Sequence, residues 1–452
     1  MSRLPFAVAA FGVYAAASLA LLRHINLAVP EPYMDEIFHI PQAQRYCAGL
    51  FREWDPKLTT PPGLYLVSLV PAWMLGVSPC SVEMLRTTNW VLGLALFWTM
   101  RFLVTRHSQP QATALNSALL TLVLALFPVT FFLNHLYYTD TGSLLFVLLA
   151  YALSLQERHA LAGLAGFVSL WFRQTNVVWV AFVGFSAALT SIQRKHGIAD
   201  SNRGLSLVQL LKWLLRFDGH VLSILLLLTP YLAVVGLFAV FLYANQGIVL
   251  GDKSHHAAGV HLPQMFYFCS YVVGISAPSI VLSASPLRFV RRLTSRPRRF
   301  ILEIALCAIM MAIIRRFTIE HPFLLSDNRH YPFYIWKNIY RRHWAVRYAV
   351  TPLYTYAAWA MYQCIKLRQS TLWLLALTAC TMAVLVPSPL LEFRYFTAPY
   401  FFFRLNCSQP STRSTVLELA WFVVVNALTV WIFLNKPFTW DSEPGRLQRF
   451  MW

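Results

Sequence analysis

The chain has 452 residues, of which 58% are hydrophobic and 12% are charged, and its mean hydropathy is +0.54. Soluble domains carry about twice that share of charge, so the composition excludes a water-soluble protein and indicates an all-α polytopic membrane protein. The net charge of +19 is explained by basic residues in cytosolic loops. Because the chain shows no nucleic-acid-binding module, we expect no nucleic-acid partner.

Apolar segments that approach the length of a membrane span recur along the chain. The first, 5–27, is interpreted as an uncleaved signal anchor because no cleavage site follows it. The run 62–78 is broken by Pro62 and Pro71, so we predict a juxtamembrane helix at the interface. We expect about 11–14 spans in a single transmembrane domain covering 1–452. The further predicted spans are 84–105, 113–133, 142–156, 160–172, 177–191, 221–243, 264–284, 301–315, 346–365, 371–387, 395–405 and 414–434.

Charge distribution predicts the orientation of these spans. Loop 285–300 contains six arginines and no acid, and 192–220 is also basic, so both are predicted to be cytosolic. Arg315 and Arg316 are the exception, because this threading places them on the luminal side. The same threading puts every motif-rich segment in the lumen and the sequon at Asn406 in the cytosol, where it would remain unmodified.

The seven cysteines include no CxxC pair, which excludes a zinc ribbon or a thioredoxin-like motif. Cys47 and Cys80 both fall on the predicted luminal side, where the oxidising environment permits a disulfide between them.

The first luminal loop, 28–62, is predicted to be catalytic. Asp35 and Glu36 lie among apolar residues at the membrane edge, where a carboxylate is costly unless it has a function. Either could act as a general base towards a sugar hydroxyl or bind a divalent metal, although each could also be a solvated capping acid. His39, in the same loop, is a candidate substrate-binding residue.

Two shorter polar segments interrupt the apolar pattern. Asp140 follows two tyrosines and either orients the acceptor or caps the next helix. Arg173, Gln174 and Asn176 form a polar run that is typical of a pocket wall, with a snorkelling anchor as the alternative for the arginine.

The loop 244–263 contains Lys253 and His255 among further histidines. A divalent metal is conceivable there but is not favoured, because the histidine spacing matches no common metal motif. We expect no metal site and instead assign these residues to the stabilisation of a phosphate leaving group.

A second dense luminal loop, 317–345, is predicted to be cationic. The planar guanidinium of arginine suits phosphate and diphosphate oxygens. Further along, Glu392 and Arg394 form either a local ion pair or part of the site. The candidate substrate-binding residues of the cationic loop are Asp327, Asn328, Arg329, His330, Lys337 and Arg341.

No GxGxxG, P-loop or GxSxG motif is present. A luminal enzyme without a nucleotide-binding motif is consistent with a sugar donor linked to a lipid phosphate, which arrives through the bilayer.

The segments YMDEIFHIPQAQRYC, WDPKLTTPPGLY, LYYTD, FRQTN, GDKSHH and DNRHYPFYIWK together resemble the family of endoplasmic-reticulum α-1,2-glucosyltransferases that use dolichyl phosphate glucose. The likeness runs from about Tyr33 to the C-terminal RFMW. Pro332 differs from the threonine common at that position of the family, and proline removes a backbone donor from the 327–342 loop.

The resemblance implies a GT-C-type bundle in the endoplasmic reticulum membrane, with luminal loops, juxtamembrane helices and a luminal active site. It implies dolichyl phosphate glucose as donor and a diglucosylated dolichyl-diphosphate oligosaccharide as acceptor, with inversion at the transferred glucose. The family's acidic base maps onto Asp35, with Glu36 adjacent. Alternatives are an α-1,3-glucosyl- or mannosyltransferase acting on lipid-linked sugars, or a non-enzymatic channel-modulating membrane protein.

Overall fold

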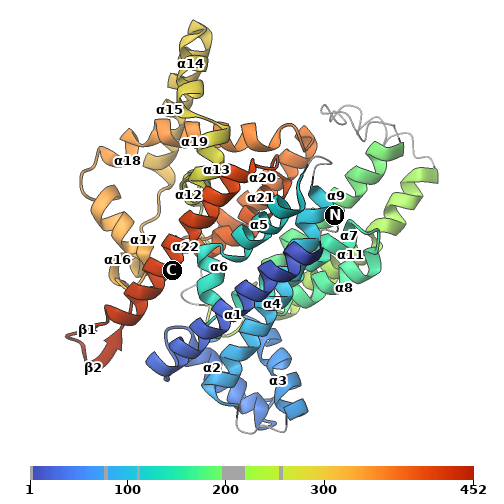
Figure 1. The fold of residues 1–452 in the computed structure, drawn as a ribbon, viewed down its shortest axis with the longest axis vertical. Helices are drawn as coiled ribbons and strands as arrows, with labels where there is room; N and C mark the ends of the chain where they lie inside the picture. The colour runs from blue at the N-terminus through green and yellow to red at the C-terminus, as the bar shows by residue number, and fades with distance from the viewer. Residues whose placement is uncertain (1–3, 76–79, 109–111, 196–218, 254–257) are drawn as a thin grey trace. The chain divides into compact units, whose positions relative to one another are not determined.

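The computed structural model describes residues 4–75, 80–108, 112–195, 219–253 and 258–452. The chain groups into two compact units, Met1–Ala257 with Ser370–Ala376, and Ala258–Gln369 with Leu377–Trp452. Both are built almost entirely from helices, several of them long and apolar (Figure 1). The predicted all-α polytopic membrane class is thereby confirmed.

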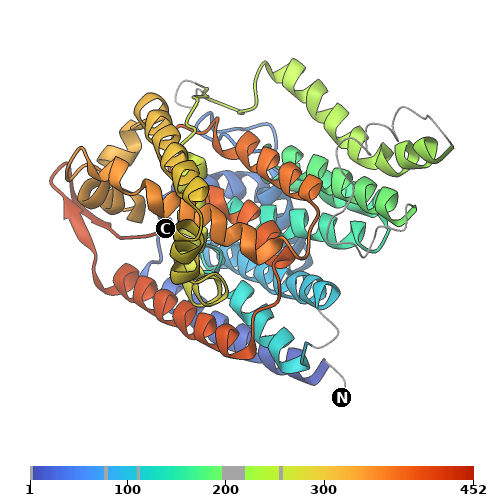
Figure 2. The ribbon, with the colours of Figure 1, turned by 90° about the horizontal axis from the view of Figure 1, so that it is seen from above.

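The first unit is a helical bundle in which α7, α8, α9 and α11 pack side by side (Figures 1 and 2). Serine and threonine N-caps begin two of its helices, since Ser81 accepts from the amide of Met84 and Thr113 from that of Asn116. Its helices are α1 Leu4–Ala28, α2 Glu36–Cys47, α3 Gly63–Leu75, α4 Val82–His107, α5 Ala114–Ala125, α6 Pro128–Leu133, α7 Thr139–Ser154, α8 His159–Leu170, α9 Asn176–Lys195 and α11 Gly219–Asn245.

The second unit combines apolar helices with short helical segments and a small C-terminal sheet. Helix α20, Thr371–Leu385, begins in the first unit and ends in the second. The other elements are α12 Gln264–Ile275, α13 Ala277–Ser283, α14 Pro286–Thr294, α15 Pro297–Phe317, α16 Pro322–Ser326, α17 Tyr331–Ile335, the π-helix η1 Trp336–Tyr340, α18 Val346–Ala349, α19 Thr351–Ile365, the 3₁₀-helix η2 Phe393–Phe396, α21 Thr397–Asn406, α22 Thr412–Asn435, β1 Phe438–Trp440 and β2 Glu443–Gln448.

Four described helices are long and apolar enough to cross a membrane, α1, α9, α11 and α22, and a bent pair raises the number to five. Only 17% of the most apolar window of α11 is buried, which leaves its surface for lipid. Four more apolar helices, α5, α7, α8 and α20, are shorter than a full span. The larger number of spans expected from the sequence relies on these short helices and on α4 and α15, which carry charged residues.

Prolines divide several segments that were predicted as single spans. The segment 264–284 bends by 95° between α12 and α13, where Pro278 occupies the first turn of α13. The segment 113–133 breaks into α5 and α6 at Pro128, and 346–365 breaks before Pro352. Proline lacks the amide that would continue the preceding helix, so each of these three predicted spans is divided into two helical segments.

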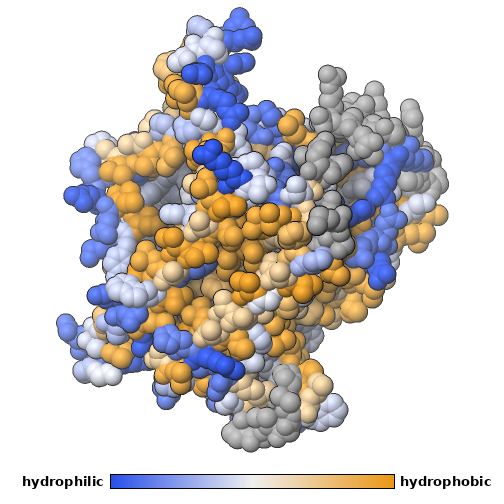
Figure 3. Space-filling view, in the orientation of Figure 1, coloured by the Kyte–Doolittle hydropathy of each residue, from blue (hydrophilic) through white to orange (hydrophobic). Residues whose placement is uncertain are grey.

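The basic segment 285–300 was predicted as a loop, but it folds into α14 and the first turn of α15. Proline at the first turn of each helix favours helix initiation. The arginines of α14 are exposed, and hydrophilic surface gathers around this helix (Figure 3).

Covalent and strand contacts fix two further regions. Cys47 and Cys80 form a disulfide that joins the end of α2 to the start of α4, as the luminal interpretation allowed. After the long helix α22, β1 and β2 pair antiparallel with Phe438 opposite Gln448 (Figure 2). This hairpin was not predicted from the sequence.

The side chain of Asn406, in the sequon that was predicted to remain unmodified, is fully buried.

Candidate functional site

Asp35 lies immediately before α2 on a strained stretch of backbone. The preceding residue, Met34, has a φ of +56°, a left-handed conformation that is costly for a side chain of its size. The Asp35 amide donates to the hydroxyl of Tyr138 at 3.2 Å, and the residue is half-buried. The backbone is therefore held in one conformation at the residue predicted to be the base.

Glu36 forms a fully buried ion pair with Arg86 of α4. Arg86 donates from Nε to Oε1 at 2.8 Å and from Nη2 to Oε2 at 2.6 Å, and neither side chain is exposed to solvent. Glu36 also accepts from the amides of Tyr33 at 3.0 Å and Tyr137 at 2.7 Å. Each carboxylate oxygen therefore has two donors, which offsets the cost of burying the charge.

The other nitrogens of Arg86 extend the network to the end of α1. Nη1 donates to Asn26 Oδ1 at 3.2 Å and to the carbonyl of Val29 at 2.7 Å, and Nη2 donates to the carbonyl of Glu31 at 3.2 Å. The pair thus joins α1, α2, α4 and the segment before α7 around Asp35. We define the Asp35 cluster as Asp35, Glu36, Arg86, Tyr138, Asp140 and Arg173.

Sequence reasoning missed Arg86, although a signal for it existed. Arg86 lies inside the predicted span 84–105, and an ionised residue inside a span requires a partner. Asn89, one turn further along α4, was missed as well. Its amide donates to the carbonyls of Leu136 at 2.6 Å and Tyr138 at 2.7 Å, and so positions the segment that leads to Asp140.

Asp140 and Arg173 form an ion pair at 2.8 Å between the start of α7 and the loop before α9. Their side chains are 10% and 19% exposed, in contrast to Glu36 and Arg86. This pair therefore keeps access to a ligand while it remains oriented. The structure brings Asp140 and Arg173, which are far apart in sequence, together as predicted site residues.

His39 and Asn176 are more enclosed. His39 Nδ1 shares a hydrogen bond of 2.7 Å with the hydroxyl of Tyr65, whose burial holds its pKa well above the usual value. Asn176 donates to Ser143 Oγ at 2.8 Å and to the carbonyl of Ser169 at 2.9 Å. Asn176 therefore joins α7, α8 and α9, which is a structural contact.

The carbonyl of Thr59 connects three motifs of the first unit. It accepts from Gln174 Nε2 at 2.7 Å and from the amide of Leu250 at 3.2 Å. Next to it, Gly251 has a φ of +62°, and a Cβ there would lie 2.2 Å from the carbonyl oxygen of Pro56. Only glycine fits this approach, so the loops 56–59 and 250–252 are packed together.

Lys253 is engaged at the end of α11. Its Nζ donates to the carbonyls of Asn245 and Gln246, an arrangement that satisfies the terminal carbonyls of a helix. His255, predicted as its neighbour in the site, lies outside the described residues.

The second unit holds the motif Asp327–His330. Arg329 donates to both carboxylate oxygens of Asp327 at 2.8 Å. Burial raises the pKa of Asp327, but the hydrogen bonds and charge of Arg329, together with His330, outweigh burial and leave that pKa below its usual value. Asp327 is therefore ionised, and its charge is paired with Arg329.

The C-terminal tail covers this motif, which the sequence did not predict. Arg329 stacks over the ring of Trp440 at 4.5 Å and donates to Gln448 Oε1 at 3.1 Å. The indole of Trp440 donates to Asn328 Oδ1 at 2.9 Å, and His330 Nδ1 donates to the carbonyl of Trp452 at 2.9 Å. We call residues 327–330 with 440–452 the tail-bound motif.

The remaining predicted cations lie nearby in the same unit. Lys337 lies over the ring of Phe333 at 5.5 Å, and Arg341 is 3.8 Å from Glu320. Arg394 forms an ion pair with Glu392, the local alternative considered for these residues. Pro332 occupies the first turn of α17, where a proline is compatible with the helix.

Within the described ranges, no group of three or more His, Cys, Asp or Glu side chains is arranged to hold a metal ion. Four of the candidate carboxylates, those of Glu36, Asp140, Asp327 and Glu392, are instead paired with arginines. Such pairs can bind sugar hydroxyls, orient a phosphate and accept a proton.

Comparison with known proteins gives a consistent result over nearly the whole chain. The model of the DIE2/ALG10 family matches residues 29–405. The chain is 41% identical to the Dol-P-Glc:Glc(2)Man(9)GlcNAc(2)-PP-Dol alpha-1,2-glucosyltransferase of Rattus norvegicus, and 40% identical to the human protein of that name, with 96% of each chain covered in both cases. The Arabidopsis thaliana protein of the same name is 35% identical, over 95% of this chain and 96% of its own.

No solved structure matches the chain. The family match covers more than half of the residues, and the relatives align over almost their full lengths. The chain belongs to the DIE2/ALG10 family.

Proposed function

We propose that the chain transfers glucose from dolichyl phosphate glucose, in α-1,2 linkage, to a diglucosylated dolichyl-diphosphate oligosaccharide. The full-length similarity to relatives named for that reaction carries this proposal. The Asp35 cluster is consistent with it, because Asp35 is half-buried and the Asp140–Arg173 pair is partly exposed.

In the proposed reaction Asp35 acts as the general base. Its carboxylate takes the proton from the acceptor 2-hydroxyl while that oxygen attacks the anomeric carbon of the donor glucose. The bond from this carbon to the phosphate oxygen breaks, and the configuration inverts from β to α. Dolichyl phosphate leaves as a stable anion, so no general acid is required. Glu36 is assigned a positioning role, because both of its oxygens are already occupied.

Arg173 is the cation that we assign to the leaving phosphate. It is partly exposed and is held by Asp140, whereas the guanidinium of Arg329 is also stacked on Trp440 and bound to Gln448 of the C-terminal tail, and the amine of Lys253 is bound to backbone carbonyls. A preorganised guanidinium stabilises phosphate charge as it develops in the transition state. Asp140 thereby orients Arg173 and can also accept a hydrogen bond from a sugar hydroxyl.

An apolar cavity of about 230 Å³ starts beside Gln174, the neighbour of Arg173. Rings and aliphatic side chains of α8 and α11 line it, including Phe167, Leu237 and Phe241. Helix α11 is largely open to lipid. We assign this cavity to the first isoprene units of the donor, whose phosphate would then lie next to Arg173.

We place the reaction on the luminal face of the endoplasmic reticulum membrane. The relatives' names imply a donor and an acceptor that are both lipids, so both substrates reach the site from the bilayer. The basic segment 285–300 supports this orientation, because positively charged segments remain cytosolic.

A panel of acceptors tests the proposed function. The purified protein receives dolichyl phosphate glucose and dolichyl-diphosphate oligosaccharides that carry zero, one or two glucoses. We expect transfer only to the diglucosylated acceptor, with an α-1,2 linkage in the product. Transfer to the acceptor without glucose or with one glucose would instead indicate a different step of lipid-linked oligosaccharide synthesis.

A further inference from the structure

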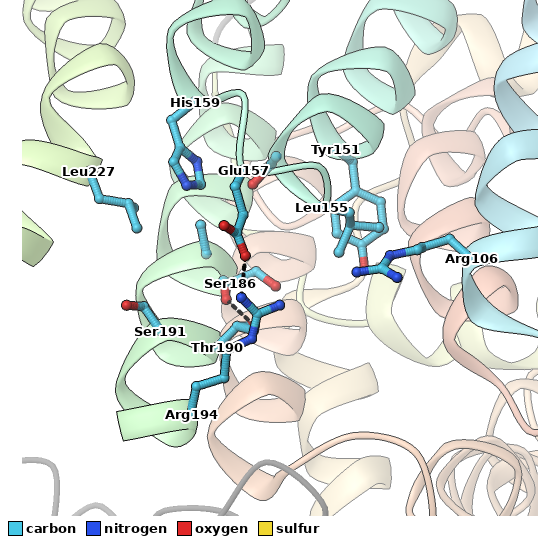
Figure 4. Close-up of a pocket in the computed structure, with 12 residues that line it drawn as sticks. Arg106, Tyr151, Leu155, Glu157, His159, Ser186, Thr190, Ser191, Arg194 and Leu227 are labelled. Carbon is cyan, nitrogen blue, oxygen red and sulfur yellow. Dashed lines mark hydrogen bonds and ion pairs between the residues drawn. The ribbon is translucent and has the colours of Figure 1, made fainter. Parts of the chain in front are cut away.

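A second polar cavity lies in the first unit, away from the Asp35 cluster. It has a volume of about 180 Å³ and is formed where α7 and α9 end and α8 begins (Figure 4). Asp140 lies at the start of α7 and Ser154 at its end. Fourteen residues of helix separate the two by roughly 21 Å, so this distal pocket opens at the opposite end of the bundle from the proposed active site.

The distal pocket is lined by cations and hydroxyl groups. The guanidinium groups of Arg106 and Arg194 approach it from different helices, α4 and α9 (Figure 4). Ser186 accepts from the indole of Trp373 at 3.0 Å, which leaves its own proton free to donate. The other hydroxyl groups and the imidazole that line the pocket belong to Tyr151, Ser154, His159, Thr190 and Ser191.

Arg106 has no hydrogen bond or ion pair with any residue of the described segments, and its charge acts on Glu157 only at longer range. Its charge is therefore not used to hold the fold. A guanidinium at the rim of a cavity, with five donors and no acceptor, is suited to an anion that enters the cavity.

Glu157 lines this cavity and forms an ion pair with Arg194, and the two side chains are 65% and 51% exposed. It lies after α7 with a φ of +62°, where the amides of Glu157 and Arg158 donate to the carbonyls of Ser154 and Leu153. Glycine is the usual residue at such a helix end. A glutamate in this conformation strains the backbone, and the conformation places its carboxylate against Arg194.

We propose that the distal pocket binds a phosphate group, which replaces the Glu157 carboxylate on Arg194 and also binds Arg106. Two arginines and one glutamate leave the pocket with one net positive charge, and the hydroxyl groups of Ser186 and Ser191 supply additional donors. Paired guanidinium groups are the preferred partners of phosphate oxygens. The phosphate can belong to a lipid headgroup or to a soluble ester.

The surroundings fit a lipid source. Leu227 of α11 lines the pocket, and the neighbouring Leu225 and Leu226 are 45% and 67% exposed. In a membrane-spanning bundle such leucines contact acyl chains, which would place a headgroup at the pocket. The threading predicts that this end of the bundle is cytosolic, where anionic lipids are enriched.

The test compares two probes that share a phosphate monoester. Delipidated full-length protein is titrated with phosphatidic acid and with glycerol 3-phosphate, and phosphatidylcholine serves as the neutral reference. Native mass spectrometry measures the lipids, and calorimetry measures the soluble ester. Binding of phosphatidic acid alone identifies a lipid site, whereas binding of both esters identifies a phosphate site that is open to solutes.

Charge variants supply the decisive comparison. Arg106→Gln should weaken phosphate binding at least about tenfold, because a charge-assisted contact is lost, and Arg194→Gln should do the same. Glu157→Gln should strengthen binding, since it removes the competing carboxylate. Arg158→Gln is the matched control, because it removes the same charge from an adjacent exposed residue that does not line the pocket.

Two results would overturn the proposal. One is the absence of binding by both esters. The other is an equal loss of binding in Arg158→Gln and Arg106→Gln, which would indicate only a general attraction to positive surface. Arg106→Gln breaks no hydrogen bond or ion pair with a residue in the described part of the chain and should fold, and its glucosyl transfer should match that of the unaltered protein. Failure of the acceptor panel would leave these binding outcomes unchanged.

Discussion

Two carboxylate–arginine pairs in this molecule differ in their exposure to solvent and in the segments that they join. Glu36 and Arg86 in the first unit are 0% exposed, and each Glu36 oxygen has two donors. Asp327 and Arg329 in the second unit are each 19% exposed and are separated by one residue in sequence. The first pair joins segments that are distant in sequence, whereas the second is local and is covered by the C-terminal tail.

The difference shows which charges can react and which ones hold the backbone. A fully buried and saturated pair has no capacity left for a substrate, but it fixes the residues on either side of it. Asp35 is bonded directly to Glu36, and the strain at Met34 is maintained by the same network. The Asp140–Arg173 pair is instead partly exposed, so a ligand can reach it.

The largest effect is expected for Asp35→Asn. Loss of a general base lowers the rate of transfer by about 10²–10⁴-fold, and the hydrogen bond from the Asp35 amide to Tyr138 does not depend on the side chain that is changed. Product formation with the diglucosylated acceptor measures the rate. Glu53→Gln is the control in the same loop, since its side chain is 54% exposed and 3.9 Å from Arg45. Equal activity of the two variants would remove Asp35 from the mechanism.

Arg86→Met should destabilise the protein more than any change at the partly exposed pairs. The substitution leaves the Glu36 carboxylate buried without its partner, which costs about 3–5 kcal/mol. The thermal midpoint in detergent measures the loss. The double variant Glu36→Leu with Arg86→Met removes both charges and should recover part of it. A midpoint unchanged in Arg86→Met would show that the pair is dispensable.

The motif positions could be predicted from the sequence because charged and polar residues are rare in an apolar chain. Asp35, Asp140 and Arg173 stand out for that reason, and the structure pairs Asp140 with Arg173 and holds the Asp35 amide against Tyr138, two residues before Asp140. Their roles in the reaction stay predictions. Partners were harder to predict, because Arg86 lies inside an apparent span and only three-dimensional packing places it against Glu36.

Helix continuity and the tail were the weakest parts of the sequence prediction. Hydropathy averages over a window, so a single residue such as Pro128 or Pro278 does not interrupt the signal that it breaks in the structure. The tail residues Trp440 and Gln448 carry no pattern that identifies Arg329 as their partner. Such contacts depend on long-range packing and not on local preference.

The buried imidazole of His261 should make the stability of the second unit depend on pH. It is fully buried near the carbonyl of Pro389, and burial lowers its pKa to about 4, although that carbonyl opposes the shift. The contribution of the neutral, buried imidazole to the free energy of unfolding is complete above the unfolded pKa of about 6.5. It is lost as pH falls towards 4, because in that range the unfolded chain takes up a proton that the folded chain does not. The loss is at most about 3 kcal/mol.

Thermal midpoints at pH 7 and pH 4.5 measure this contribution. His261→Asn should reduce the difference between the two midpoints. His343→Asn is the matched control, because that histidine is exposed in the same unit. A pH difference that is unaffected by His261→Asn would assign the acid sensitivity to other groups.

The smallest effect is expected for Arg329→Met. Water screens a partly exposed pair, so its loss and that of the stacking on Trp440 should cost only about 1–2 kcal/mol. The fall in thermal midpoint should therefore be clearly smaller than for Arg86→Met, a substitution of the same kind. Hydrogen exchange should increase in the tail, because Arg329 also binds Gln448. If Arg329→Met and Arg86→Met lowered the thermal midpoint equally, exposure to solvent would not distinguish a structural ion pair from an accessible one.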